Sequence, residues 1–219
     1  MDDSKILFMA CAIVVEEFRS VLPEKMPCHV LDFRLHMSPD KLHQTLQESI
    51  NTEAVNYDTV ILGYGLCAQA VIGIQASCCR LIVPKVDDCI ALFLGSRSDY
   101  KDRHRSHPGT YYLTNGWIRK GDTPFSEYEH AVQKYGKERA DRIIKIMLAN
   151  YNQLTLIDNG VHDMGESRDY ARRTAERFGL KFEELKGSSR MLIKLVNGPW
   201  DDEVVVIEKG ESIQFEHFL

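Results

Sequence analysis

Short apolar runs alternate with amphipathic stretches along the first ninety residues. Runs such as KILFMAC at 5–11 have the length of buried strands, while 39–52 carries Leu42, Leu46 and Ile50 at helical spacing. Strands are predicted at 5–11, 28–35, 59–62 and 80–83, and helices at 14–22, 39–52 and 66–74. This alternation predicts a parallel sheet with right-handed crossovers.

The second half of the chain resumes the alternation after a polar stretch. Residues 96–107 are strongly charged and are predicted as a mobile loop. Further strands are predicted at 111–114, 154–157, 181–185 and 203–207, and helices at 90–94, 126–135, 137–151, 167–178 and 189–196. We therefore expect a Rossmann-like α/β domain over 1–219, built either as one sheet or as two lobes, 1–95 and 120–219, around a cleft.

Composition narrows the class of protein. The chain has 219 residues, a net charge of −5 and no apolar run long enough for a membrane span, which argues against nucleic-acid and membrane partners. The first residues lack the basic start of a signal peptide, so we expect a cytoplasmic protein. Because cytosolic thiols stay reduced, the six cysteines point to metal binding, catalysis or burial. The oligomeric state is not predicted.

A soft metal ligand follows each of the first four predicted strands. These residues are Cys11, His36, Cys67 and Cys89. Since parallel strands end at one edge of a sheet, the four side chains are expected to converge there, and three thiolates with one imidazole suit tetrahedral zinc. Iron, cobalt or an iron–sulfur cluster would accept the same ligands. The alternatives are that the cysteines pack in the core and that His36 only contacts the next helix.

Cys67 also has the surroundings of a reactive thiol. The glycines of Gly63-Tyr64-Gly65 are expected to turn the chain sharply and to place Cys67 at a helix N-terminus, where the helix dipole lowers a thiol pKa. Gly65 is a candidate for backbone contact with substrate. Dinucleotide binding is disfavoured, because Ala68 stands where GxGxxG requires its third glycine.

Asp88 precedes Cys89 and favours a metal over a free thiol nucleophile. A carboxylate beside a bare thiol raises the thiol pKa, whereas beside a cation it orients ligands or acts as a base. Asp88 and Cys67 are thus the candidate catalytic residues. The simpler alternative is that the aspartate caps the following helix.

Other residues are candidates for substrate or cofactor binding. The basic segment around His104 and His107 would cover an anionic ligand, unless it is merely a solvated face. Aromatic and strand-end positions complete the set, with core packing as their alternative: Tyr112, Trp117, Asp158 and His162.

Several short motifs resemble one family. They are the run ending in His36, YGLC at 64–67, DCI at 88–90 and GTYYLTNGW at 109–117. Together they are similar to the family catalogued as domain of unknown function 1638, found in bacteria and methanogenic archaea. The chain departs from the pattern at Ala12, where glycine is expected. The resemblance implies an association with one-carbon and corrinoid-linked methyl metabolism, and with a small-molecule or corrinoid-protein partner.

Three functional hypotheses follow. The first is a zinc-dependent enzyme of methyl transfer, in which His36 leaves one coordination position open for substrate. The second is a non-catalytic protein that binds or delivers a metal or a tetrapyrrole-like cofactor. The third is a metal-free thiol enzyme with Cys67 as nucleophile.

Overall fold

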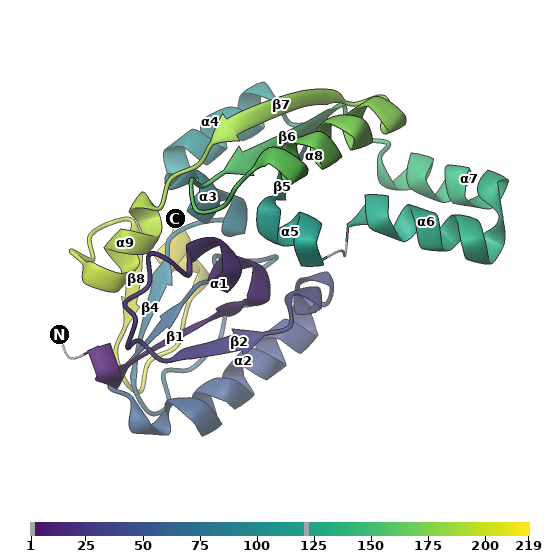
Figure 1. Ribbon diagram of the computed structural model, residues 1–219. Helices are drawn as coiled ribbons and strands as arrows, with labels where there is room; N and C mark the ends of the chain where they lie inside the picture. Colours follow the sequence, from purple (N-terminus) through teal and green to yellow (C-terminus); the bar gives the residue numbers. More distant parts are fainter. Residues whose placement is uncertain (1–2, 121–122) are drawn as a thin grey trace. The chain divides into compact units, whose positions relative to one another are not determined.

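The computed structural model describes residues 3–120 and 123–219, and the chain divides into two compact units. The first unit consists of the residues up to Tyr100 together with Ser188–Leu219, and the second unit is Lys101–Gly187. Each unit has its own sheet, with five strands in the first and three in the second (Figure 1). The α/β class with mainly parallel sheets flanked by helices is as the sequence predicts.

The sheet of the first unit has the strand order β2-β1-β3-β4-β8. Strands β1 to β4 are parallel, and β8 runs antiparallel to β4. Their bounds are β1 Ile6–Cys11, β2 Cys28–Leu31, β3 Thr59–Leu62, β4 Arg80–Pro84 and β8 Val204–Ile207. The chain passes from β1 to β2 on one side and then to β3 on the other side. This reversal is the kind of point where Rossmann-like sheets bind ligands, at the carboxyl ends of the strands.

Helices and 3-10 turns surround this sheet. The α-helices are α1 Ala12–Phe18, α2 Pro39–Glu53, α3 Cys89–Leu94 and α9 Arg190–Asn197, and α4 (Arg97–Ser106) begins here and ends in the second unit. The 3-10 helices are η1 Asp3–Lys5, η2 Phe33–Met37, η3 Ala54–Asn56 and η4 Phe215–Phe218.

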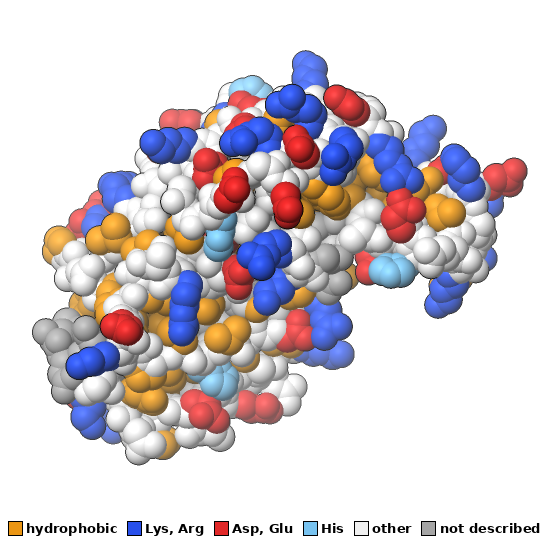
Figure 2. Space-filling model, viewed as in Figure 1, with side chains coloured by type: hydrophobic (Ala, Val, Ile, Leu, Met, Phe, Trp, Pro, Cys, Tyr) orange, Lys and Arg blue, Asp and Glu red, His pale blue; other side chains and the backbone are white. Residues whose placement is uncertain are grey.

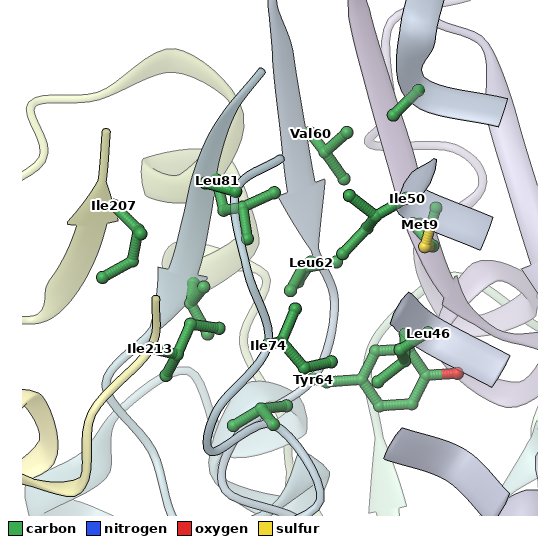
Figure 3. Packing of buried hydrophobic residues seen from close by; sticks show 14 of the residues in the cluster. Met9, Leu46, Ile50, Val60, Leu62, Tyr64, Ile74, Leu81, Ile207 and Ile213 are labelled. Atoms are coloured by element: carbon green, nitrogen blue, oxygen red, sulfur yellow. The ribbon is translucent and has the colours of Figure 1, made fainter. Parts of the chain in front are cut away.

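The core of the first unit follows the predicted periodicity. Leu42, Leu46 and Ile50 of α2 are fully buried, as their spacing predicts. They pack in one cluster with residues of β1, β3 and β4, including Met9 and Leu62 (Figure 3). Burying a large aliphatic side chain contributes about 1.5–3 kcal/mol, so this cluster stabilises the strands whose ends carry the thiols.

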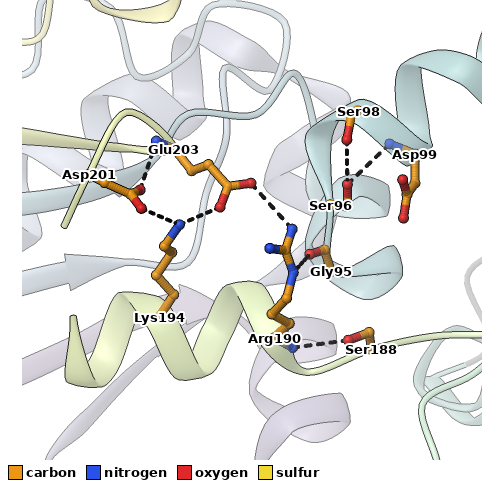
Figure 4. A network of polar contacts seen from close by, with 9 residues as sticks. All are labelled: Gly95, Ser96, Ser98, Asp99, Ser188, Arg190, Lys194, Asp201 and Glu203. Carbon is orange, nitrogen blue, oxygen red and sulfur yellow. Dashed lines mark hydrogen bonds and ion pairs between the residues drawn. The ribbon is translucent and has the colours of Figure 1, made fainter. Parts of the chain in front are cut away.

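A polar network holds α9 beside the far end of α3. Lys194 Nζ lies 2.7 Å from an Asp201 carboxylate oxygen and also pairs with Glu203. Arg190 Nε donates to the carbonyl oxygen of Gly95 at 3.1 Å (Figure 4). Gly95 ends α3 with φ +74°, in the left-handed region that favours glycine. The network fixes the C-terminal end of the helix that begins with Cys89.

The second unit has three parallel strands in sequence order. They are β5 Thr110–Thr114, β6 Gln153–Asp158 and β7 Lys181–Lys186. Its helices are α5 Asn115–Lys120, α6 Pro124–Tyr135, α7 Lys137–Met147 and α8 Gly165–Phe178. Gly136, with φ +78°, separates α6 from α7, as predicted.

Two segments differ from their predicted structure. Residues 66–74 are turns and not a helix, because Leu66 and Cys67 donate their N–H groups to the carbonyls of Val86 and Asp87 (2.9 and 3.0 Å). Residues 97–106 are helical and not a loop, since Ser96 Oγ accepts from Asp99 N–H (3.1 Å) and caps the first turn. Charged composition alone did not distinguish a solvated helix from a loop.

Candidate functional site

The loops that carry the three candidate thiols meet at the β1–β3 reversal. Cys11 is the last residue of β1, Cys67 follows β3, and Cys89 begins α3 after β4. The loop after β3 is hydrogen-bonded to β1 and to the loop after β4. Gly63 N–H donates to the carbonyl oxygen of Met9 at 2.8 Å, and Cys67 N–H to that of Asp87 at 3.0 Å. The structure therefore brings the segments that carry the three cysteines together.

Electrostatics give the same grouping of the side chains. Burial raises the pKa of Cys67 to about 12, with further contributions from Asp88 and Cys11. Burial also raises the pKa of Cys89 well above its usual range, and Asp88, Cys11 and Cys67 raise it further. Burial likewise raises the pKa of Cys11. The thiols therefore influence one another in a buried environment, in which they are neutral at pH 7.

Gly63 and Gly65 allow the loops to pack closely. A Cβ atom on Gly65 would lie 2.5 Å from the carbonyl oxygen of Val86, and one on Gly63 would lie 2.6 Å from Cβ of Ala10. Neither glycine has a positive φ. The missing side chains, rather than an unusual backbone conformation, bring the loop of Cys67 against its neighbours.

The backbone at Cys67 is strained. Cys67, Ala68 and Gln69 have φ angles of 46°, 56° and 69°, in the left-handed region. Each such non-glycine residue costs on the order of 1–3 kcal/mol, and such residues cluster at functional sites. Because no helix starts here, the predicted lowering of the Cys67 pKa by a helix dipole is wrong, and burial raises it instead.

Tyr64 is the site residue that sequence reasoning did not identify as a functional group. Its side chain is only 4% exposed, and its hydroxyl has no hydrogen-bond partner among the described residues. Burial raises its pKa, and the charges of Cys11, Cys67 and Cys89 raise it further. A buried hydroxyl without a partner costs about 1–3 kcal/mol, so a bound group that satisfied it would be stabilised. Its place in the YGLC motif was the available signal.

Asp88 caps α3, as the simpler interpretation of the sequence predicts. Its Oδ1 accepts from Ile90 N–H at 2.8 Å, and its Oδ2 accepts from the Tyr100 hydroxyl at 2.7 Å. Burial raises the pKa of this carboxyl, against the effect of both hydrogen bonds. The two bonds fix the start of the helix at Cys89. A catalytic role for Asp88 stays a prediction.

His36 does not directly follow the end of a strand, although the sequence predicts that it does. Strand β2 ends at Leu31, and His36 is in η2, where its ring stacks on Phe33 at 6.1 Å between centroids. Its Nδ1 contacts the carbonyl oxygen of Phe33, and its side chain is exposed. The predicted strand 28–35 was too long, because the chain turns at Asp32, whose side chain caps η2.

The described residues contain no group of three or more His, Cys, Asp or Glu side chains already placed to hold a metal ion. The donor set of three thiols suits a soft cation chemically, but its side chains do not form a closed cage.

A family model matches residues 30–196, most of the chain. The chain belongs to the DUF1638 family. This match confirms the resemblance seen in the motifs. The family is described as a protein of unknown function, so the match assigns no activity. The region matched to DUF1638 contains His36, Cys67 and Cys89, while Cys11 lies before it. The comparisons with curated proteins and with solved structures each gave no match.

The remaining predicted binding residues of this DUF1638 protein belong to its second unit. His104 and His107 are exposed, in α4 and just after it, and Trp117 packs against the core of the unit. Asp158 Oδ1 accepts from Gly160 N–H at 2.8 Å, which shapes the turn after β6.

The basic segment that was predicted to cover a ligand is a helix, and one of its cations, Arg103, is paired with Glu183. Tyr112 is half-buried on β5, and His162 is treated below.

On the face shown in Figure 2, acidic and basic side chains are interspersed. In the part of the chain that the structure describes, no helix combines the length and apolarity that crossing a bilayer requires.

We expect Cys67 to react slowly with iodoacetamide in metal-free native protein at pH 8. Its pKa of about 12 leaves little thiolate, so alkylation should be more than about tenfold slower than for the same cysteine in urea. Mass spectrometry of the peptide containing Cys67 measures both rates. Equal rates would show that the native thiol is not suppressed by burial.

Proposed function

We propose that the first unit binds a soft metal ion, zinc in the first instance, through Cys11, Cys67 and Cys89. The observation that carries this proposal is the meeting of three thiol-bearing loops at the β1–β3 reversal, where the chain is strained at Cys67. Thiolates are preferred ligands of zinc and related cations.

The electrostatics of the site support the proposal that it binds a cation. Three neighbouring thiols and a buried carboxyl oppose one another's ionisation, so the site alone favours protonated sulfur. A divalent cation reverses that preference, because a coordinated thiol loses its proton. The six described cysteines are all free, as a cytoplasmic location would keep them.

A metal-free thiol enzyme is the weaker hypothesis. A nucleophilic cysteine needs a cationic or strongly hydrogen-bonding environment that stabilises the thiolate. The largest influences on Cys67 are burial and the Asp88 carboxylate, and both raise its pKa.

The number of protein ligands separates delivery from catalysis. Ligation by His36 as well as the three thiols would fill a tetrahedral site and favour storage or delivery of the ion. Three thiols with one open position would suit the corrinoid-linked methyl transfer expected from the family resemblance. The variant His36→Ala distinguishes these arrangements, since it weakens metal binding only if the imidazole is a ligand.

Elemental analysis of protein purified without an affinity tag tests the proposal. We expect about one equivalent of zinc or a similar transition metal per chain, retained through dialysis against buffer without chelator. Less than about a tenth of an equivalent, both as purified and after incubation with zinc under reducing conditions, would overturn it.

A further inference from the structure

The second unit contains a pocket at the carboxyl end of β5. It is formed by the start of α5, the turn after β6 and the first turns of α8. Carboxyl ends of parallel strands are the usual place for ligands in α/β sheets. The residues that matter for its chemistry are Asn115, Arg119, His162, Ser167 and Arg173.

Asn115 places an unsatisfied donor in this pocket. The residue is only 5% exposed, and its Oδ1 accepts from the Ser167 hydroxyl at 2.7 Å. In this orientation of the amide Nδ2 is the atom left over, and it has no hydrogen-bond partner among the described residues. A buried amide N–H without an acceptor costs about 1–3 kcal/mol, which a ligand oxygen would offset.

His162 supplies a second buried nitrogen. Its Nε2 is buried and has no hydrogen-bond partner in the described part of the chain. In the tautomer protonated at Nε2, this nitrogen is also a donor. Asn115 directly follows β5 and His162 lies in the turn after the adjacent strand β6, so two buried nitrogens from different elements line one pocket.

The charges around the pocket restrict the ligand. Arg119 and Arg173 are exposed lining residues with guanidinium groups suited to carboxylate. The helix α8, 14 residues long, begins in the pocket and adds the positive end of its dipole. Three exposed acidic residues oppose a ligand of high negative charge: Asp163, Glu166 and Asp169. Asp163 Oδ1 also accepts from Gly165 N–H at 3.0 Å.

We propose that this pocket binds a small monocarboxylate, with one carboxylate oxygen accepting from Asn115 Nδ2. A single negative charge accepts from the buried Asn115 amide and faces the guanidinium of Arg173, whereas the three carboxylates disfavour the higher charge of phosphate. The proposal is independent of the metal site, because it concerns other residues in the other unit.

NMR titration of the ¹⁵N-labelled full chain with acetate, butyrate and benzoate, at constant ionic strength, tests the inference. At least one carboxylate should give saturable shifts of the Asn115 side-chain amide signals. Inorganic phosphate should bind at least about tenfold more weakly, because the acidic residues repel its higher negative charge more strongly. The Asn115→Asp variant keeps the oxygen that accepts from Ser167 but replaces the donor, so carboxylate affinity should fall about tenfold or more.

Two further variants keep the test decisive. Asn150→Asp adds the same charge at an exposed position outside the pocket and should bind as wild type does. Arg173→Gln, on the exposed rim, should weaken binding about threefold to tenfold even if the Asn115 variant does not fold. The inference is overturned if no carboxylate gives saturable shifts, if phosphate binds as tightly as the carboxylates, or if Arg173→Gln and a folded Asn115→Asp protein leave affinity unchanged.

Discussion

The Cys89→Ser variant is expected to lose its metal. Cys89 is the first residue of α3, at a helix start that the capping Asp88 fixes. Structural zinc sites bind with about 10–16 kcal/mol in total, so one of four ligands corresponds to about 3 kcal/mol, or about a hundredfold in affinity. A serine hydroxyl keeps its proton at pH 7 and is a poor ligand for a soft cation. Competition with a chromophoric chelator measures the loss.

Cys28→Ser provides the matched control for this experiment. Cys28 stands at the start of β2, at the opposite end of the strand from the reversal, and its Sγ donates to the carbonyl oxygen of Met26 at 3.5 Å. This variant should keep the wild-type metal content. Equal loss of metal from the Cys28 and Cys89 variants would mean that the affinity does not depend on the site at the strand ends.

The Gly65→Ala variant is expected to show the largest loss of stability among small substitutions near the site. The new Cβ would lie 2.5 Å from the carbonyl oxygen of Val86, and this obstacle is backbone that cannot rotate away. Overpacking of this kind costs about 1–3 kcal/mol or more. The shift would also separate the loop of Cys67 from that of Cys89. Urea unfolding measures the change, and metal content measures the consequence for the site.

Gly165→Ala is the corresponding control for stability. A Cβ at Gly165, the first residue of α8, would meet only Asp163 Oδ1 at 3.4 Å, an ordinary contact. Alanine also favours helix, so this variant should be neutral or slightly more stable, by up to about 1 kcal/mol. A Gly65→Ala protein as stable as the Gly165→Ala protein would show that the two loops are not packed as closely as described.

The sequence predicted those features that depend on local pattern. Strand β3 was predicted with its observed bounds at 59–62, and the helical spacing of Leu42, Leu46 and Ile50 identified the buried face of α2. The strand-end argument located the segments of Cys11, Cys67 and Cys89 at one place, since parallel strands must end at one edge.

Features that depend on contacts between residues far apart in the sequence could not be predicted from the local pattern of apolar and polar residues. The segment 66–74 is apolar enough for a helix, but the N–H groups of Leu66 and Cys67 bond to the carbonyls of Val86 and Asp87, about twenty positions away. The last strand, β8, pairs with β4 of the first unit, and the alternation of elements along the chain does not specify that pairing. Nothing in local sequence marks Tyr64 or Asn115 as buried groups with unsatisfied hydrogen-bonding atoms, because that depends on which atoms surround them in the fold.

X-ray absorption spectroscopy at the zinc edge tests most directly whether one ion draws these thiols together. The protein loaded with one equivalent of zinc is expected to show about three sulfur neighbours at about 2.3 Å, falling to about two in the Cys89→Ser variant at the same occupancy. A first shell made only of nitrogen and oxygen, or a sulfur count that the substitution leaves unchanged, would contradict a metal site built from Cys11, Cys67 and Cys89.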